Sequence, residues 1–167
     1  PTDGAAIQDL GADFWPLRLA RELDDAILHL RGNENQIGTW LFHTSGDGDL
    51  VAAHDAAMAA NQDHWLVREV ILYLKRTLKR IDVTSRSIFA IIEPGSCFNG
   101  TLLELALAAD RSYMLDGQFE GDNRPPATVS LTAMNFGAYD MVNGLTRLQS
   151  RFLGDRDTIA ALDLRQD

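Results

Sequence analysis

The stretch SIFAIIEPGSCFNGTLLELALAAD, residues 87–110, decides the fold class of this chain. Its first part, residues 87–92, is apolar and rich in isoleucine, which is typical of a buried β-strand. Pro94 and Gly95 end this strand, and the segment rich in leucine and alanine that follows their loop predicts a helix. A buried strand that leads into a helix is the basic unit of an α/β domain.

The flanking segments continue this alternation of strands and helices. Pro16 suits the first turn of a helix, and apolar residues at helical spacing follow it until Gly32. The other predicted elements are strands over 37–42 and 111–115 and helices over 52–61, 62–80 and 145–153. Residues 1–14 and 117–127 read as irregular. This order favours an α/β fold whose strands are largely parallel and covered.

The composition is that of an ordinary folded domain with an excess of acidic residues. The 167 residues are 46% hydrophobic and 23% charged, with a formal net charge of −9. This charge argues against a nucleic-acid partner, and the lack of a long apolar run argues against a membrane span. Because Cys97 is the only cysteine, no internal disulfide can form, which favours a cytoplasmic setting. The start at Pro1 suggests a piece trimmed from a longer chain.

Glu104 lies near the start of the predicted helix, and the residues alone leave two roles open for it. Thr101-Leu-Leu-Glu104 has the spacing of a capping box, in which each side chain accepts from the other residue's backbone N–H. Alternatively, the loop before the helix presents N–H groups to a phosphate or to a carbonyl oxygen that gains charge, and Glu104 acts there as an acid or base. The two roles compete, because a carboxylate folded onto its own backbone is not aimed at a substrate.

Several segments resemble the crotonase superfamily of enoyl-CoA hydratases and isomerases. Residues 99–110 are similar to its glycine-rich turn followed by Glu-Leu-Ala-x-x-x-Asp, and residues 136–154 are similar to its later Gly-x-x-Arg-Leu segment. Residues 20–28, 65–71 and 87–111, the last with its specific IEPGSCF motif, resemble the second, C-terminal half of a ring-opening lyase branch with two crotonase-like halves. The resemblance extends over about residues 14–154.

This resemblance implies a crotonase-like (ClpP/crotonase) α/β fold, a spiral of ββα units that is incomplete in this chain. It implies a CoA-thioester substrate whose carbonyl oxygen lies between two backbone N–H groups, and no separate cofactor, since CoA is part of the substrate. For the longer lyase it implies hydrolytic opening of the epoxidised ring of benzoyl-CoA to a semialdehyde thioester and formate.

The resemblance also assigns site residues, of which most are altered here. One oxyanion donor falls on the turn at Gly100 and Thr101, where the Thr101 N–H is the candidate although its side chain takes up space that the family leaves open. The other falls on Ala52-Ala-His-Asp55, which lacks the family's glycine, so that His54 either faces the substrate or is a surface histidine. Glu104 falls on a catalytic carboxylate position of the hydratases.

The second hydratase carboxylate falls on Ala133 or Met134, and neither side chain can transfer a proton. Glu120 and Asp122 are nearby acids, although a turn explains them equally well. The four histidines show no convincing metal pattern, so no metal site is predicted. The cations of Lys75-Arg76-Thr-Leu-Lys79-Arg80 are expected to form a solvated helix face rather than a phosphate site.

We therefore expect a crotonase-like domain over 1–154 and a tail or fraying helix over 155–167. The favoured hypothesis is the C-terminal half of the ring-opening lyase, with an eroded site, an N-terminal crotonase-like half as its partner and inactivity when isolated. A homo-oligomer is expected, as in crotonase relatives. A self-contained CoA-thioester enzyme that uses Thr101 and Glu104 is one alternative, and a non-catalytic oligomerisation module is the other.

Overall fold

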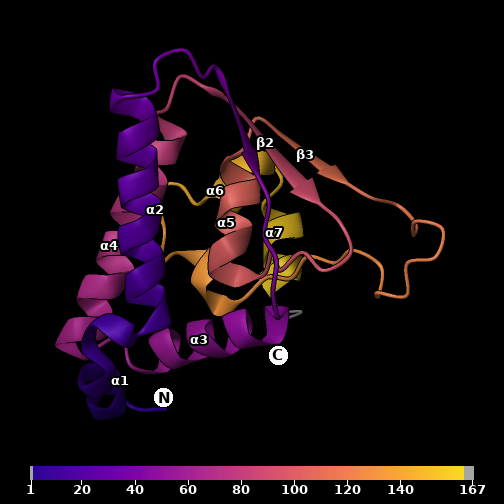
Figure 1. Cartoon of the computed structure of the whole chain (residues 1–167). Helices are drawn as coiled ribbons and strands as arrows, with labels where there is room; N and C mark the ends of the chain where they lie inside the picture. The colour runs from indigo at the N-terminus through magenta and orange to yellow at the C-terminus, as the bar shows by residue number, and fades with distance from the viewer. Residues whose placement is uncertain (1, 164–167) are drawn as a thin grey trace.

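The computed structural model describes residues 2–163 and shows a mixed α/β fold around one three-stranded sheet (Figure 1). Strands β1 (Thr39–Phe42), β2 (Ser87–Ile92) and β3 (Arg111–Met114) are parallel and lie in the order β1-β2-β3. The predicted strand over 87–92 is confirmed, and the other two strands are slightly shorter than predicted. The parallel sheet is compatible with a crotonase-like fold, whereas the spiral of ββα units stays a prediction.

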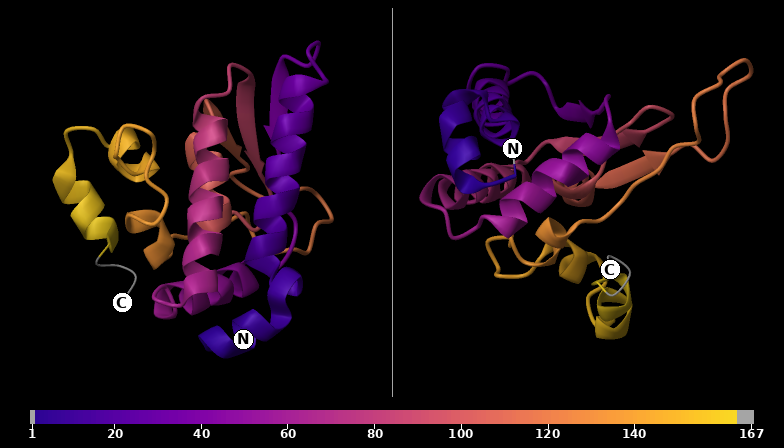
Figure 2. Two further views of the ribbon diagram at one scale, coloured as in Figure 1. Left: turned by 90° about the vertical axis from the view of Figure 1, so that its left-hand side faces the viewer. Right: turned by 90° about the horizontal axis from the view of Figure 1, so that it is seen from below.

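Helices form the connections between these strands. Helices α3 (Gly48–Ala60) and α4 (Trp65–Asp82) lead from β1 to β2, and α5 (Gly100–Ala108) leads from β2 to β3. Helix α2 (Trp15–Gly32) packs along α4, as the left view of Figure 2 shows. Helix α3 begins earlier than predicted because the Asp47 carboxylate caps it, accepting from the backbone N–H of Asp49 at 2.8 Å.

The N-terminal end of the chain contains more helix than the sequence predicts. Residues 1–14 were expected to be irregular, but α1 (Gly4–Leu10) and the 3-10 helix η1 (Gly11–Asp13) occupy most of them. The Asp3 side chain caps α1, and the burial of Ile7 holds it against the core. After η2 (Ala133–Phe136) and α6 (Arg147–Arg151), helix α7 (Arg156–Asp163) forms part of the predicted tail, whose remainder, 164–167, lies outside the described residues.

The two faces of the sheet differ in burial. Ile88, Ala90 and Ile92 alternate along β2 toward the helices and are buried. On the opposite face, Leu41 is 57% exposed and Tyr113 is 51% exposed. Figure 1 shows the sheet in front of α5 with no helix on its near side. The prediction that the strands are covered is therefore wrong for this face within residues 2–163, because the helices described there pack elsewhere.

The segment between β3 and η2 is a long loop that projects from the rest of the fold, as the right view of Figure 2 shows. None of the helices in residues 2–163 combines the length and the apolarity that crossing a bilayer requires.

Candidate functional site

The first turn of α5 is held by a buried carboxylate from α3. Asp55 Oδ2 accepts from the backbone N–H of Thr101 at 2.8 Å, and Asp55 Oδ1 accepts from the Thr101 hydroxyl at 2.5 Å. The Thr132 hydroxyl also donates to Asp55 Oδ2, at 2.8 Å. Asp55 is only 1% exposed, and no lysine or arginine within residues 2–163 forms an ion pair with it. Three donors around one carboxylate thus take the place of a cation.

Gly100 makes this close approach possible. Its φ of +48° lies in the left-handed region, which side chains disfavour, and a Cβ at this position would overlap the Asp55 carboxylate. The backbone carbonyl of Gly100 accepts from the Asn135 amide at 2.9 Å. The glycine of the turn is therefore required both by its conformation and by the space that Asp55 occupies.

The Thr101 hydroxyl is the centre of a short buried chain of hydrogen bonds. Since its hydrogen is donated to Asp55, its oxygen accepts from the Tyr139 hydroxyl, 2.9 Å away. Tyr139 is 2% exposed, and burial raises the pKa of its hydroxyl well above the ordinary value, so that it remains a donor.

The capping box expected at Thr101 and Glu104 is not formed. Thr101 is turned to Asp55, and the two oxygens of Glu104 accept from the Asn135 amide at 2.7 Å and from the Arg147 guanidinium at 2.8 Å. The carboxylate of Glu104 therefore accepts from side chains of other elements and not from the backbone N–H groups of its own helix terminus. A catalytic role for Glu104 stays a prediction.

Arg147 joins Glu104 to the end of α4. Its Nε and Nη2 donate to the two oxygens of Asp82 at 2.9 and 2.6 Å, and its Nη1 donates to Glu104 and to the Tyr139 carbonyl. All three charged side chains are nearly inaccessible, with Arg147 only 1% exposed. One cation is thus shared between two carboxylates, which leaves the triad with one net negative charge.

Burial sets the direction of the pKa shifts in both clusters. It raises the pKa of the Asp55 carboxyl, and the hydrogen bonds from Thr101 and Thr132 only partly oppose this effect. Burial also raises the pKa of the Glu104 carboxyl, against the charge of Arg147 and the amide of Asn135. Raised carboxyl pKa values are common at functional sites, but buried structural networks produce them as well.

The backbone N–H groups predicted to form an oxyanion hole all have other partners. The Thr101 N–H donates to Asp55, and the Gly100 N–H donates to the Ser130 carbonyl at 2.9 Å. His54 lies inside α3, where the helical hydrogen-bond pattern uses its N–H. In this structure none of these three backbone N–H groups is therefore free to donate to a thioester oxygen.

The side chain of His54 faces a different part of the molecule from Glu104. A cavity of about 270 Å³ lies between the loops that follow β1 and β2, and His54, Asp47 and Cys97 are among its lining residues. The imidazole stacks on Trp15 with ring centres 5.1 Å apart, and burial lowers the pKa of His54. Gly100, Thr101 and Glu104 do not line this cavity. The structure therefore does not bring His54 together with Glu104.

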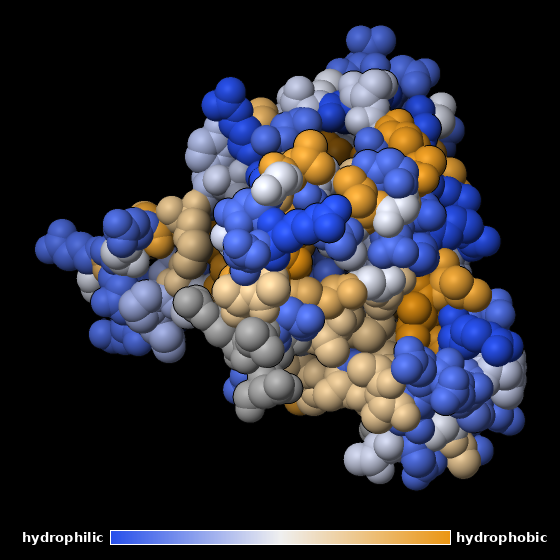
Figure 3. Space-filling view, turned by 180° about the vertical axis from the view of Figure 1, so that it is seen from behind, coloured by the Kyte–Doolittle hydropathy of each residue, from blue (hydrophilic) through white to orange (hydrophobic). Residues whose placement is uncertain are grey.

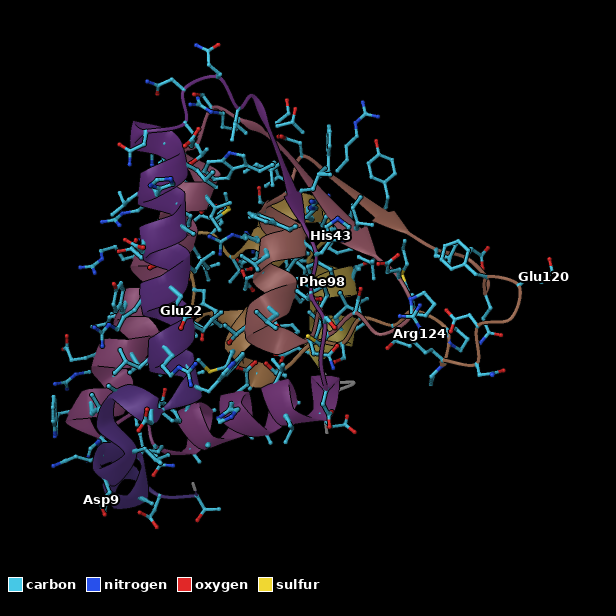
Figure 4. All side chains as sticks on the ribbon, in the orientation of Figure 1. Asp9, Glu22, His43, Phe98, Glu120 and Arg124 are labelled. Carbon is cyan, nitrogen blue, oxygen red and sulfur yellow. The ribbon has the colours of Figure 1, made fainter. Side chains whose placement is uncertain are left out.

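The remaining candidate acids lie on the projecting loop. Figure 4 shows Glu120 and Arg124 on this loop, away from α5, and Asp122 forms an ion pair with Arg124 at 2.8 Å. The hydrogen bonds from Arg124 lower the pKa of the Asp122 carboxyl, so this acid is held in its charged form. The basic cluster on α4 is also engaged within the fold, since Lys75 pairs with Asp140 at 3.2 Å and Arg80 pairs with Asp24.

Several residues of these clusters were not singled out from the sequence. Asp55 shares one face of α3 with the buried Val51 and Met58, and a carboxylate in such an apolar stripe is a recognisable signal. Arg147 belongs to the Gly-x-x-Arg-Leu segment, but nothing in that segment predicts its partners. Asn135 and Tyr139 gave no signal, because their roles depend on contacts with distant parts of the chain.

Comparison with known proteins gives one informative match. No family model matches the sequence. The chain is 55% identical over 162 residues to benzoyl-CoA-dihydrodiol lyase of Aromatoleum evansii, in a match that covers 97% of this chain. It covers only 28% of the lyase, so the chain spans less than a third of the length of this relative. The predicted resemblance to a longer lyase is confirmed.

Proposed function

We propose that this chain is the C-terminal crotonase-like part of a benzoyl-CoA-dihydrodiol lyase and that its role in that protein is structural. The complete lyase would open the ring of 2,3-epoxybenzoyl-CoA to a semialdehyde thioester and formate. The identity of 55% over nearly the whole chain supports membership of such a protein. In this proposal the thioester site lies in the N-terminal crotonase-like half.

The hydrogen bond from the Thr101 N–H to Asp55 carries the structural part of the proposal. A thioester carbonyl can be stabilised only by donors that are directed at its oxygen and not already engaged. Here a buried carboxylate occupies that donor at 2.8 Å, and a thioester oxygen would have to displace it. Asp55 would then lose its backbone donor while it remained buried, which is unfavourable.

The surroundings of Glu104 also support a structural role for this chain. A general acid or base must reach the substrate, whereas both oxygens of Glu104 are hydrogen-bonded to buried protein groups. The alternative, a self-contained enzyme that uses Thr101 and Glu104, would require both networks to open at once.

A chimera of the relative tests this function directly. The matched region of the lyase is replaced by this chain, and formate release from 2,3-epoxybenzoyl-CoA is measured for the chimera and for the isolated chain. We expect ring opening by the chimera only, and the same turnover per folded molecule when the chimera carries Glu104→Gln. Loss of turnover in a folded Glu104→Gln chimera, or turnover by the isolated chain, would contradict the proposal.

A further inference from the structure

We propose that the bare face of the sheet is the surface on which the rest of a lyase-length protein docks, an inference that rests on the proposed function above. The occupant is the part of the lyase that this chain does not match, and it is expected to present an apolar, uncharged face. Four side chains, Leu41, Phe89, Ile91 and Tyr113, define the surface, which we call the open sheet face.

Strand register brings these four side chains together. Leu41 and Phe89 are partners across β1 and β2, and Ile91 and Tyr113 are partners across β2 and β3. The rings of Phe89 and Tyr113 are in edge contact with centres 6.0 Å apart. The four residues therefore form one continuous apolar surface on neighbouring strands rather than scattered exposed side chains.

A parallel sheet with one bare face is an incomplete arrangement. Parallel strands occur almost only where both faces are covered, because their connections place other elements on the faces. Helices of this chain cover one face along β2, and Figure 1 shows the strands of the other face without a covering element. Both outer strands, β1 and β3, also have only one neighbour in the sheet within the described part of the chain.

The back of the molecule also carries apolar surface. Figure 3, which views the molecule from behind, shows blue hydrophilic groups mixed with orange ones above and a broad tan-to-orange region below them. Polar groups limit the open sheet face at its margins, since Thr39, Ser87 and Arg111 lie beside its apolar centre. An apolar centre with a polar rim is the usual anatomy of a protein–protein contact.

The length of the relative identifies the occupant. Most of the lyase lies outside the match, so a protein of that length contains ample chain to cover this face. The open sheet face would then be buried within one polypeptide, which explains why large apolar residues remain on it. A second copy of this chain is the competing occupant, and the test separates the two.

Cysteine labelling in the chimera measures coverage of the face. The native Cys97 is only 4% exposed, so a maleimide reports mainly on an introduced cysteine. Tyr113→Cys is compared between the isolated chain and the chimera, with Leu28→Cys on α2 as the control because Leu28 is 50% exposed. We expect Tyr113→Cys to react roughly tenfold or more slowly in the chimera, while Leu28→Cys reacts at the same rate in both.

Equal labelling rates of Tyr113→Cys in both proteins would overturn the docking proposal. If the chimera nevertheless opens the ring, the proposed function stands although the docking proposal fails. Protection in the isolated chain that disappears on dilution shows that a second copy is the occupant. If the chimera does not accumulate, this chain is co-expressed with the unmatched part of the lyase as a separate polypeptide, and full labelling of Tyr113→Cys in that sample also overturns the proposal.

Discussion

Thr101 donates its backbone N–H to the carboxylate of Asp55 at 2.8 Å, and this bond joins the start of α5 to the middle of α3. The same N–H is the donor that the crotonase resemblance assigns to a thioester oxygen. A buried side chain of the protein itself therefore sits where the resemblance would place a substrate.

Removal of the Asp55 carboxylate should destabilise the fold substantially. Asp55→Ala leaves the Thr101 N–H and two hydroxyl donors without an acceptor, and we expect a loss of about 3 kcal/mol in the free energy of unfolding. Asp55→Asn keeps one oxygen and should lose about half as much. Urea denaturation measures both, with the exposed Asp25→Ala as a control that should change stability by less than about 0.5 kcal/mol. If Asp55→Ala were as stable as the wild type, the hydrogen bonds to Asp55 would contribute little to the free energy of unfolding.

The pH dependence of stability should change when Asp55 can no longer titrate. Burial raises its pKa in the folded protein above the ordinary value of 3.8, so at intermediate pH the folded state binds more protons than the unfolded state. The free energy of unfolding then falls as the pH rises from 3.8 through the folded pKa. Asp55→Asn lacks this contribution, so the advantage of the wild type should be largest at low pH and should narrow as the pH rises.

Urea midpoints of both proteins from about pH 3 to about pH 7 provide this comparison. Because Glu104 titrates in both proteins, its own contribution cancels in the difference. A difference that grows with pH would mean that the folded pKa of Asp55 is lowered instead.

The buried triad predicts an unequal cost for its members. Arg147→Met would leave Glu104 and Asp82 as two buried carboxylates without a cation, and we expect a loss of about 4 kcal/mol. Glu104→Gln should cost only about 2 kcal/mol, because Arg147 keeps Asp82 and the loss is that of one hydrogen-bond partner. The double variant should lose less than the sum of the single variants. Equal costs for the two single variants, measured by urea denaturation, would contradict this account.

Gly100 should tolerate no side chain. Gly100→Ala combines the strain of a φ of +48° with overlap of its Cβ with the Asp55 carboxylate, and we expect a loss of about 3 kcal/mol or more. Gly144 serves as a control, because its φ is also positive, at +80°, and no other group approaches its Cβ position. Gly144→Ala should therefore show the conformational cost alone, about 1 kcal/mol. Similar losses in the two variants, measured by thermal denaturation, would mean that Asp55 moves aside easily.

The sequence predicted the fold class well because its signals are local. The strand over 87–92 and the helix that follows the glycine turn are visible in the order of apolar and turn residues. The helix at residues 4–10 was missed because its stability depends on a cap at Asp3 and on burial of Ile7 by elements distant in the sequence. The bare face of the sheet was also missed, since strands rich in apolar residues look the same whether or not another element covers them.

The candidate site was predictable only in part. The position of Glu104 at the start of α5 follows from the chain itself, but its partners Asn135 and Arg147 lie more than thirty residues away in sequence. The capping box was a sound expectation from spacing alone. It fails because the buried Asp55 competes for Thr101 and the buried Arg147 competes for Glu104, and both are long-range contacts.

The most direct test is a calorimetric titration of the isolated chain with benzoyl-CoA, with the complete lyase relative as the positive control. If Asp55 occupies the Thr101 N–H at the start of α5, the isolated chain should show no saturable binding of benzoyl-CoA with a dissociation constant below about 1 mM. Saturable binding by this chain in the micromolar range, lost in a folded Glu104→Gln variant, would instead show that its own thioester site is functional.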